Sequence, residues 1–158
     1  MSAPNIAVLV PCYNEEVAIP HVVAAFRAAL PEAVVYVYDN NSSDRTRDVA
    51  AAAGAVVRTE TLQGKGNVIR RMFGDIEADA YVLVDGDDTY DADSAPRMLR
   101  LLFDERLDMV TGTRVTEAIA AYRPGHRLGN QVLTGAVRLV FGKRITDMLS
   151  GYRVFSRR

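Results

Sequence analysis

The sequence predicts a single α/β domain built around a mostly parallel central sheet. Short apolar runs rich in Val alternate with segments whose apolar residues recur at helical spacing, and polar turns follow most of the runs. The chain has 158 residues, of which 49% are hydrophobic and 25% charged, which is typical of one soluble globular domain. No internal repeat, linker or low-complexity tract divides it.

Strands are expected where an apolar run is too short for a helix. They are predicted at residues 6–10, 34–38, 55–58, 81–84, 109–114 and 154–155. Helices are expected between them, at residues 15–30, 45–53, 65–76, 94–103 and 126–141. Pro11 is expected to end the pairing of the first strand, because proline has no N–H to donate.

Polar residues are predicted to cap these helices. Asn14 is expected at the N-cap of the first helix, with Glu15 in its first turn, and a Ser or Asp of residues 42–44 at the start of the second. If the acidic segment at residues 85–88 is only a solvated loop, Asp91 or Asp93 is expected to cap the helix at residues 94–103.

The most informative stretch is the acidic segment that follows the fourth strand. Asp85 and Asp87 are two residues apart, so on an extended backbone their side chains would point to the same side. Oxygen ligands of this kind suit Mg²⁺ or Mn²⁺, and Mg²⁺ is often held by one or two carboxylates plus substrate phosphates. The alternative is a solvated acidic loop, and the segment alone does not decide between the two.

Several polar turns are predicted to meet at one edge of the sheet. In parallel α/β sheets, ligands bind outside the carboxyl ends of the strands. Asp39, Asp85 and the turn at residues 11–15 all fall at such ends. Gly64-Lys65-Gly66 opens a helix and offers exposed N–H groups and one cation to an anion, although its spacing is not that of a Walker loop.

Composition excludes several classes of protein and site. No apolar run is long enough to span a bilayer, and no secretory signal is visible at the N-terminus. The single cysteine, Cys12, cannot form an internal disulfide, which favours a reducing cytoplasm. Two histidines and one cysteine, widely spaced, argue against a zinc site, and no nucleic-acid partner is expected.

Charge is distributed unevenly along the chain. The net charge is −8 over residues 1–113 and +7 over residues 114–158. The acidic part suits a metal site and the basic part suits an anion. The helix predicted at 126–141 is basic and amphipathic; it would lie on a membrane surface or, as we favour, pack on the sheet.

Five segments in order resemble the motifs of inverting family-two glycosyltransferases with the GT-A fold. The similarity is greatest to the polyprenyl-phosphate and dolichyl-phosphate hexosyltransferases, and the segments are residues 11–15, 39–46, 64–66, 85–87 and 147–153. The resemblance implies a Rossmann-like three-layer αβα sandwich, with residues 1–113 binding a nucleotide sugar and 114–158 on the acceptor side. Catalytic domains of this family continue further, so the chain is expected to be truncated at its C-terminus.

The resemblance also implies roles for individual residues. Arg114 would bind the acceptor phosphate and take part in catalysis, and Asp147 lies where the family has an acidic residue near the acceptor. Asp87 would be the surer of the two metal ligands in the Asp85/Asp87 pair, which would hold Mg²⁺ or Mn²⁺. Asp39 would accept a hydrogen bond from the base. The nucleotide-sugar pocket would comprise Pro11, Tyr13, Glu15, Asp39, Lys65 and Asp85, and the acceptor-phosphate site Arg114, Arg127 and Arg153.

The implied reaction transfers a hexosyl group from a UDP- or GDP-linked sugar to a polyprenyl phosphate at the cytoplasmic face of the membrane. A phosphate whose second pKa is about 6 is largely dianionic at neutral pH and would need positioning by Arg114 rather than deprotonation. A sugar hydroxyl as acceptor would instead need a base, for which Asp147 is the candidate, although Asp147 could equally be a turn or Arg-pairing residue.

Two other functions remain open at this point. The chain could bind a nucleotide sugar without turnover. A nucleotidyltransferase is disfavoured, because residues 11–16 lack the Gly- and Arg-rich loop such enzymes need.

Three positions depart from the family pattern. Asn40 stands where a second acidic residue is frequent, and Asn41 replaces a turn glycine but can adopt the same positive φ. Asp88 adds a third carboxylate, whose role stays open.

Overall fold

The computed structural model describes residues 3–112 and 150–158. Its strands are β1 (Ile6–Cys12), β2 (Val34–Asp39), β3 (Val56–Thr59), β4 (Ala80–Leu83), β5 (Met109–Thr111) and β6 (Arg153–Ser156). Its helices are α1 (Ile19–Ala29), α2 (Thr46–Ala52), α3 (Lys65–Asp75), α4 (Ala95–Asp104) and the short 3₁₀ helix η1 (Ala92–Ser94). Every strand and helix predicted within these residues is present. The helix expected at 126–141 lies outside them, as do Arg114, Arg127 and Asp147.

The six strands form one sheet in the order β3-β2-β1-β4-β6-β5. The pairs β1–β2, β1–β4 and β2–β3 are parallel, whereas β6 runs antiparallel to both of its neighbours, β4 and β5. The prediction of a mostly parallel sheet is therefore confirmed. Because β1, β2 and β4 run in the same direction, their carboxyl ends meet at one edge, where the functional side chains gather.

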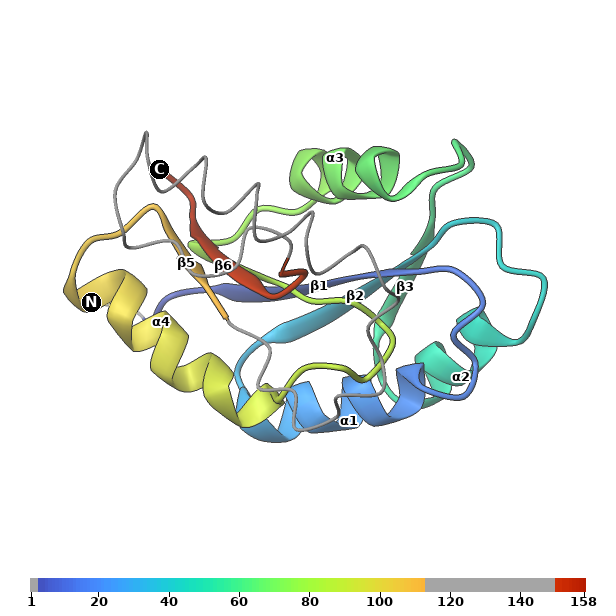
Figure 1. The fold of residues 1–158 in the computed structure, drawn as a ribbon, viewed down its shortest axis with the longest axis horizontal. Helices are drawn as coiled ribbons and strands as arrows, with labels where there is room; N and C mark the ends of the chain where they lie inside the picture. Colours follow the sequence, from blue (N-terminus) through green and yellow to red (C-terminus); the bar gives the residue numbers. More distant parts are fainter. Residues whose placement is uncertain (1–2, 113–149) are drawn as a thin grey trace, which may run out of the picture.

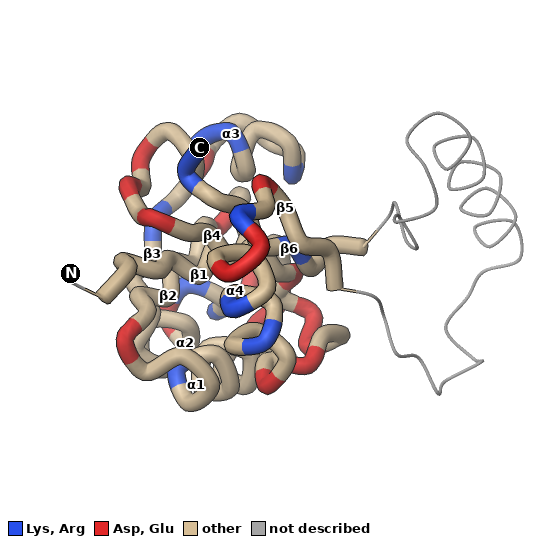
Figure 2. Tube along the Cα trace, turned by 90° about the vertical axis from the view of Figure 1, so that its left-hand side faces the viewer, with Lys and Arg blue, Asp and Glu red and all other residues tan. Residues whose placement is uncertain are grey.

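Helices cover both faces of the sheet. Figure 1 shows α1, α2 and α4 on one side and α3 on the other, and Figure 2 shows the same layers from the side. Alternate residues of each strand enter the two cores: Val8 and Val10 of β1 pack against α1, while Leu9 packs with Val68 and Met72 of α3. Among the described residues, no helix combines the length and apolar character needed to cross a bilayer.

Pro11 does not end the first strand, contrary to the prediction. β1 continues through Cys12, and Pro11 pairs with Tyr38 of β2. The Leu9 carbonyl accepts from Val84 on the β4 side, and the Cys12 carbonyl accepts from Asn40 on the β2 side. The backbone polar groups of β1 therefore point alternately to β4 and to β2, residue by residue. Pro11 therefore faces the β4 side, where β4 has already ended at Leu83, and its missing N–H removes no ladder hydrogen bond.

The N-cap predicted at Asn14 is also wrong. Helix α1 begins at Ile19, its N-cap position is Ala18, and no side chain caps it. Asn14 adopts a positive φ of 56° and its side-chain oxygen accepts from the backbone N–H of Ser43. The asparagine thus connects the turn after β1 to the turn after β2, a contact between segments that local sequence does not report.

The other helix starts agree with the predictions in part. Asp44 accepts from the backbone N–H of Thr46 at 3.0 Å, although the N-cap position itself is Arg45. Asp91 caps η1, the 3₁₀ helix that precedes α4, by accepting from the N–H of Asp93 at 3.0 Å. The N-cap of α4 itself is Ser94, whose side chain makes no capping hydrogen bond, so the predicted Asp cap of this helix is wrong. Gly54 ends α2 with a φ of 96°, as expected for a helix-ending glycine.

Candidate nucleotide-sugar and metal site

A pocket of about 350 Å³ opens where the carboxyl ends of β1, β2 and β4 meet the first turn of α3. Five of the six residues predicted for the nucleotide-sugar pocket line it, together with Asp87 of the predicted metal pair. Its lining residues are Pro11, Cys12, Tyr13, Glu15, Asn40, Gln63, Gly64, Lys65, Val68, Asp85, Gly86 and Asp87. The predicted convergence of these turns at one edge of the sheet is confirmed.

The Asp39 carboxylate is the predicted pocket residue that does not line this cavity. Asp39 is 1% exposed, and one of its oxygens, Oδ2, accepts from the backbone N–H of Ser42 at 3.2 Å. The other, Oδ1, is buried without a hydrogen-bond partner in the described structure. A buried acceptor of this kind is costly unless something donates to it, so Asp39 retains unused capacity to accept a hydrogen bond beside the pocket.

Asn40 fixes the loop that leads into α3. It is 3% exposed, and its Nδ2 donates to the carbonyls of Glu60 and Leu62 at 2.7 and 2.9 Å. Its Oδ1 accepts from the N–H of Gly64 at 2.7 Å. An aspartate could not donate to the two carbonyls. The departure from the family pattern at this position therefore has a structural reason: Asn40 holds the turn that presents Lys65 to the pocket.

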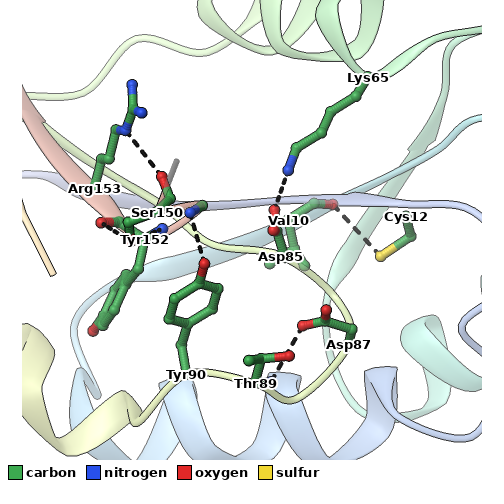
Figure 3. Close-up of polar contacts among 11 residues, drawn as sticks. Val10, Cys12, Lys65, Asp85, Asp87, Thr89, Tyr90, Ser150, Tyr152 and Arg153 are labelled. Carbon is green, nitrogen blue, oxygen red and sulfur yellow. Dashed lines mark hydrogen bonds and ion pairs between the residues drawn. The ribbon is translucent and has the colours of Figure 1, made fainter. Parts of the chain in front are cut away.

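Lys65 and Asp85 form an ion pair across the pocket. The Lys65 ammonium, at the start of α3, reaches down to Oδ1 of Asp85, as Figure 3 shows. β4 ends at Leu83, and Gly86 and Asp87 lie in a turn, so the extended backbone assumed for Asp85 and Asp87 is wrong. Asp87 is exposed, and its Oδ1 accepts from the N–H of Thr89 at 3.2 Å.

The described lining of the pocket is acidic. Glu15, Asp85 and Asp87 face a single cation, Lys65. Burial, reinforced by the carboxylates of Asp87, Asp44 and Asp85, raises the pKa of Glu15. Burial and the nearby Glu15 and Asp39 carboxylates raise the pKa of the Cys12 thiol far above its usual value. These surroundings favour the neutral thiol of Cys12 over the thiolate at neutral pH.

The residues present fit a divalent cation that is shared with a phosphate-bearing ligand. Among residues 3–112 and 150–158, no three His, Cys, Asp or Glu side chains converge as a ready-made metal cage. Mg²⁺ rarely uses such cages; one or two carboxylates plus substrate phosphates suffice. Asp85 and Asp87 both line the pocket and supply these oxygens, whereas Asp88 does not line it.

The model of glycosyl transferase family 2 matches residues 7–158, which is nearly the whole chain. The chain belongs to glycosyl transferase family 2. It is 55% identical over 124 residues to Protein RfbJ of Shigella flexneri, covering 78% of this chain and 96% of RfbJ. It is 38% identical over 164 residues to Glycosyltransferase AglJ of Haloferax volcanii, and 29% identical over 153 residues to the Dolichyl-phosphate hexose transferase of the same organism.

The solved structures confirm the GT-A fold for this family-2 chain. Glucosyl-3-phosphoglycerate synthase of Mycobacterium tuberculosis, in complex with Mn²⁺, UDP-glucose and phosphoglyceric acid, matches with a TM-score of 0.78 at 26% identity over 98% of this chain. The chain spans 57% of that structure, 52% of AglJ and 67% of the dolichyl-phosphate enzyme. It therefore spans little more than half of several of the family members that it matches.

Of the predicted acceptor-side residues, the structure describes only Arg153. It begins β6, is half buried, and its Nε donates to the carbonyl of Ser150 at 3.1 Å. Its guanidinium lies on the same side of the sheet as the Lys65 side chain (Figure 3). Arg153 does not line the nucleotide pocket, and its assignment to the acceptor phosphate stays a prediction.

Sequence reasoning missed the packing beneath the turn that carries Asp85 and Asp87. A β-carbon at Gly86 would lie 2.7 Å from Sγ of Cys12, inside van der Waals contact. Position 86 thus requires glycine because the Cys12 sulfur leaves no room for a β-carbon, and not because of its backbone conformation. A glycine between two acidic residues was the available signal, but only the structure shows what it approaches.

Gly86→Ala is expected to lower the free energy of unfolding by about 1–2 kcal/mol, because the added methyl group overpacks against Cys12. In a Cys12→Ala background the same change should cost much less, since the sulfur is gone. Thermal or urea unfolding of the four proteins of this double-mutant cycle measures the coupling.

Gly74→Ala provides the control for the Gly86 experiment. An added β-carbon there meets nothing within 4 Å, and alanine has a higher helix propensity than glycine. We expect Gly74→Ala to be neutral or stabilising. Equal costs of Gly86→Ala in the presence and absence of the Cys12 sulfur would rule out the proposed contact.

Proposed function

We propose that the chain binds a nucleotide-diphosphate sugar and transfers its hexosyl group to a polyprenyl phosphate by metal-assisted inverting displacement. The observation that carries this proposal is the pocket at the strand ends, where Asp85, Asp87 and Glu15 face Lys65. Three carboxylates repel a diphosphate, and the single ammonium of Lys65 does not offset them. A divalent cation would make the pocket compatible with such a donor.

The donor is held by residues from three segments of the fold, in addition to the metal site. Tyr13, whose side chain is 53% exposed at the mouth of the pocket, offers its ring for stacking on the base. Asp39 offers its unpartnered Oδ1 to an N–H donor of the base. Lys65 and the N-terminus of α3 face the phosphates, where the helix dipole and the ammonium both favour negative charge.

Asp85 and Asp87 are the residues that would hold Mg²⁺ or Mn²⁺. When bound, the cation neutralises the charge that develops on the nucleoside diphosphate leaving group. Lys65, which contacts Asp85, would add a positive charge that stabilises the leaving group. The crystal structure of the mycobacterial synthase with Mn²⁺ and UDP-glucose supports a divalent cation in a donor site of this fold.

The acceptor is assigned to the basic part of the chain, residues 114–158, with the donor on residues 1–113. Arg114, Arg127 and Arg153 supply positive charge that positions a lipid phosphate for attack on the anomeric carbon. A phosphate dianion needs no general base. The name of the dolichyl-phosphate relative supports a lipid phosphate, and such a lipid would place the protein at the cytoplasmic face of the membrane.

A second candidate acceptor is a hydroxyl group on a small molecule. It is favoured by the structural match to a synthase solved with phosphoglyceric acid. In that case the reaction needs a base, and Asp147 is the residue proposed for it. Nucleotide-sugar binding without turnover is the remaining alternative.

Transfer assays with the complete gene product separate these functions. The protein is incubated with Mn²⁺, radiolabelled UDP- or GDP-hexoses, and either a polyprenyl phosphate or soluble hydroxyl acceptors. The proposal expects label in the lipid fraction, with loss of transfer when EDTA removes the metal. Label on a soluble acceptor alone would overturn the lipid assignment, and nucleotide binding without transfer to any acceptor would overturn the enzymatic one.

A further inference from the structure

Gly151 lies directly against the carboxylate of Asp85. The strands β4 and β6 pair as far as Leu83 and Arg153, which brings Asp85, two residues after β4 ends, near Gly151, two residues before β6 begins. A β-carbon on Gly151 would overlap with this carboxylate, lying 2.6 Å from its Cγ. The backbone of Gly151 therefore forms one wall for Asp85, and Lys65 contacts the same carboxylate as well.

The position of Gly151 is fixed in turn by Tyr90. The N–H of Gly151 donates to the Tyr90 hydroxyl at 2.6 Å, a contact drawn in Figure 3. Tyr90 is 8% exposed, and its ring packs on Tyr152 with centroids 5.5 Å apart. Tyr152 in turn packs edge-on against Phe26 of α1 at 5.9 Å. The Tyr90 ring is therefore held by aromatic packing, and the hydroxyl adds the bond to Gly151.

The turn at residues 85–90 consequently contacts Gly151, which lies just before β6, at both of its ends. Asp85 begins this turn and meets Gly151 through its carboxylate; Tyr90 closes it and meets Gly151 through its hydroxyl. We propose that Tyr90 is a positioning residue for Asp85, acting through the backbone of Gly151, and that it sets the affinity of the donor site for its divalent cation. This inference rests on the proposed function.

Tyr90→Phe tests the inference, because it removes the hydroxyl and keeps the ring that packs on Tyr152. Loss of the hydrogen bond from Gly151 to the Tyr90 hydroxyl is expected to raise the Mn²⁺ concentration that half-saturates UDP binding about three- to tenfold. Calorimetry at fixed UDP, with electron paramagnetic resonance to count free Mn²⁺, measures it without reference to turnover. UDP binding in the absence of metal is expected to stay unchanged.

Tyr152→Phe is the matched control. It removes the hydroxyl of the neighbouring ring, which accepts from Oγ of Ser94 at 3.4 Å, and leaves the Tyr90–Gly151 bond in place. Mn²⁺ dependence of this variant should equal that of the unmodified protein. Gly151→Ala, which crowds Asp85 directly, should weaken Mn²⁺-dependent binding more than Tyr90→Phe does.

The possible outcomes separate this inference from the proposed function. If the unmodified protein binds UDP with Mn²⁺ and Tyr90→Phe binds Mn²⁺ equally well, the positioning role is overturned and the function stands. Equal weakening by Tyr90→Phe and Tyr152→Phe would also overturn it, since the effect would then come from the ring cluster as a whole. Failure of the unmodified protein to bind UDP and Mn²⁺ would overturn both.

Discussion

Asp87→Asn is expected to weaken Mn²⁺-dependent binding of UDP or GDP at least about 100-fold, while the thermal melt of the metal-free protein stays the same. Mutation of a residue that only hydrogen-bonds to a metal ligand already lowers metal affinity about 10–100-fold. Mutation of a ligand itself should therefore lower it at least as much. Asp87 is exposed, and its hydrogen bond from Thr89 can equally be accepted by the amide oxygen of asparagine. The substitution thus removes a charge and the proposed metal ligand but keeps the turn.

Asp88→Asn is the control for the Asp87 variant. Asp88 is exposed and outside the pocket lining, and its φ of 59° is one that asparagine adopts readily. Calorimetry with and without Mn²⁺ should show a less than about twofold change. Equal losses in the two variants would indicate a general charge effect, and a lower melting temperature of metal-free Asp87→Asn would show that Asp87 is structural.

The layout of the fold could be predicted because its signals are local. Both faces of β1 and β2 are covered by helices, so their apolar runs are continuous and easily read as strands. Parallel strands with helical connections then place the polar turns at one edge, whatever the details of packing. This is why most of the predicted donor-side residues lie together in the structure.

The errors come from residues whose partners are distant in sequence. Asn14 has the sequence context of a helix cap, yet its oxygen binds Ser43, 29 residues away. The contact of Gly151 with Asp85 depends on the antiparallel placement of β6, which no local pattern reports. Asn40 looked like a weakened acidic motif, and its three bonds to the 60–64 loop become visible only once β2 and β3 are paired.

Asn40→Asp is expected to lower the free energy of unfolding by about 3 kcal/mol. The carboxylate cannot donate to the Glu60 and Leu62 carbonyls, and each buried group left unsatisfied costs about 1–3 kcal/mol. For a domain of this size the melting temperature should fall by roughly 10 °C. Because the same loop presents Gly64 and Lys65 to the pocket, affinity for UDP should fall as well, by about tenfold or more.

Asn41→Asp makes the same chemical change one residue later and isolates the role of burial. The Nδ2 of Asn41 also donates to the loop, to the Thr61 carbonyl and the Gln63 side chain, but Asn41 is exposed and water can replace both bonds. Aspartate tolerates its positive φ of 65° as well. We therefore expect a loss below about 1 kcal/mol. Similar melting temperatures for the two variants would show that Asn40 does not hold the loop, and that the acidic residue frequent in the family would serve equally well here.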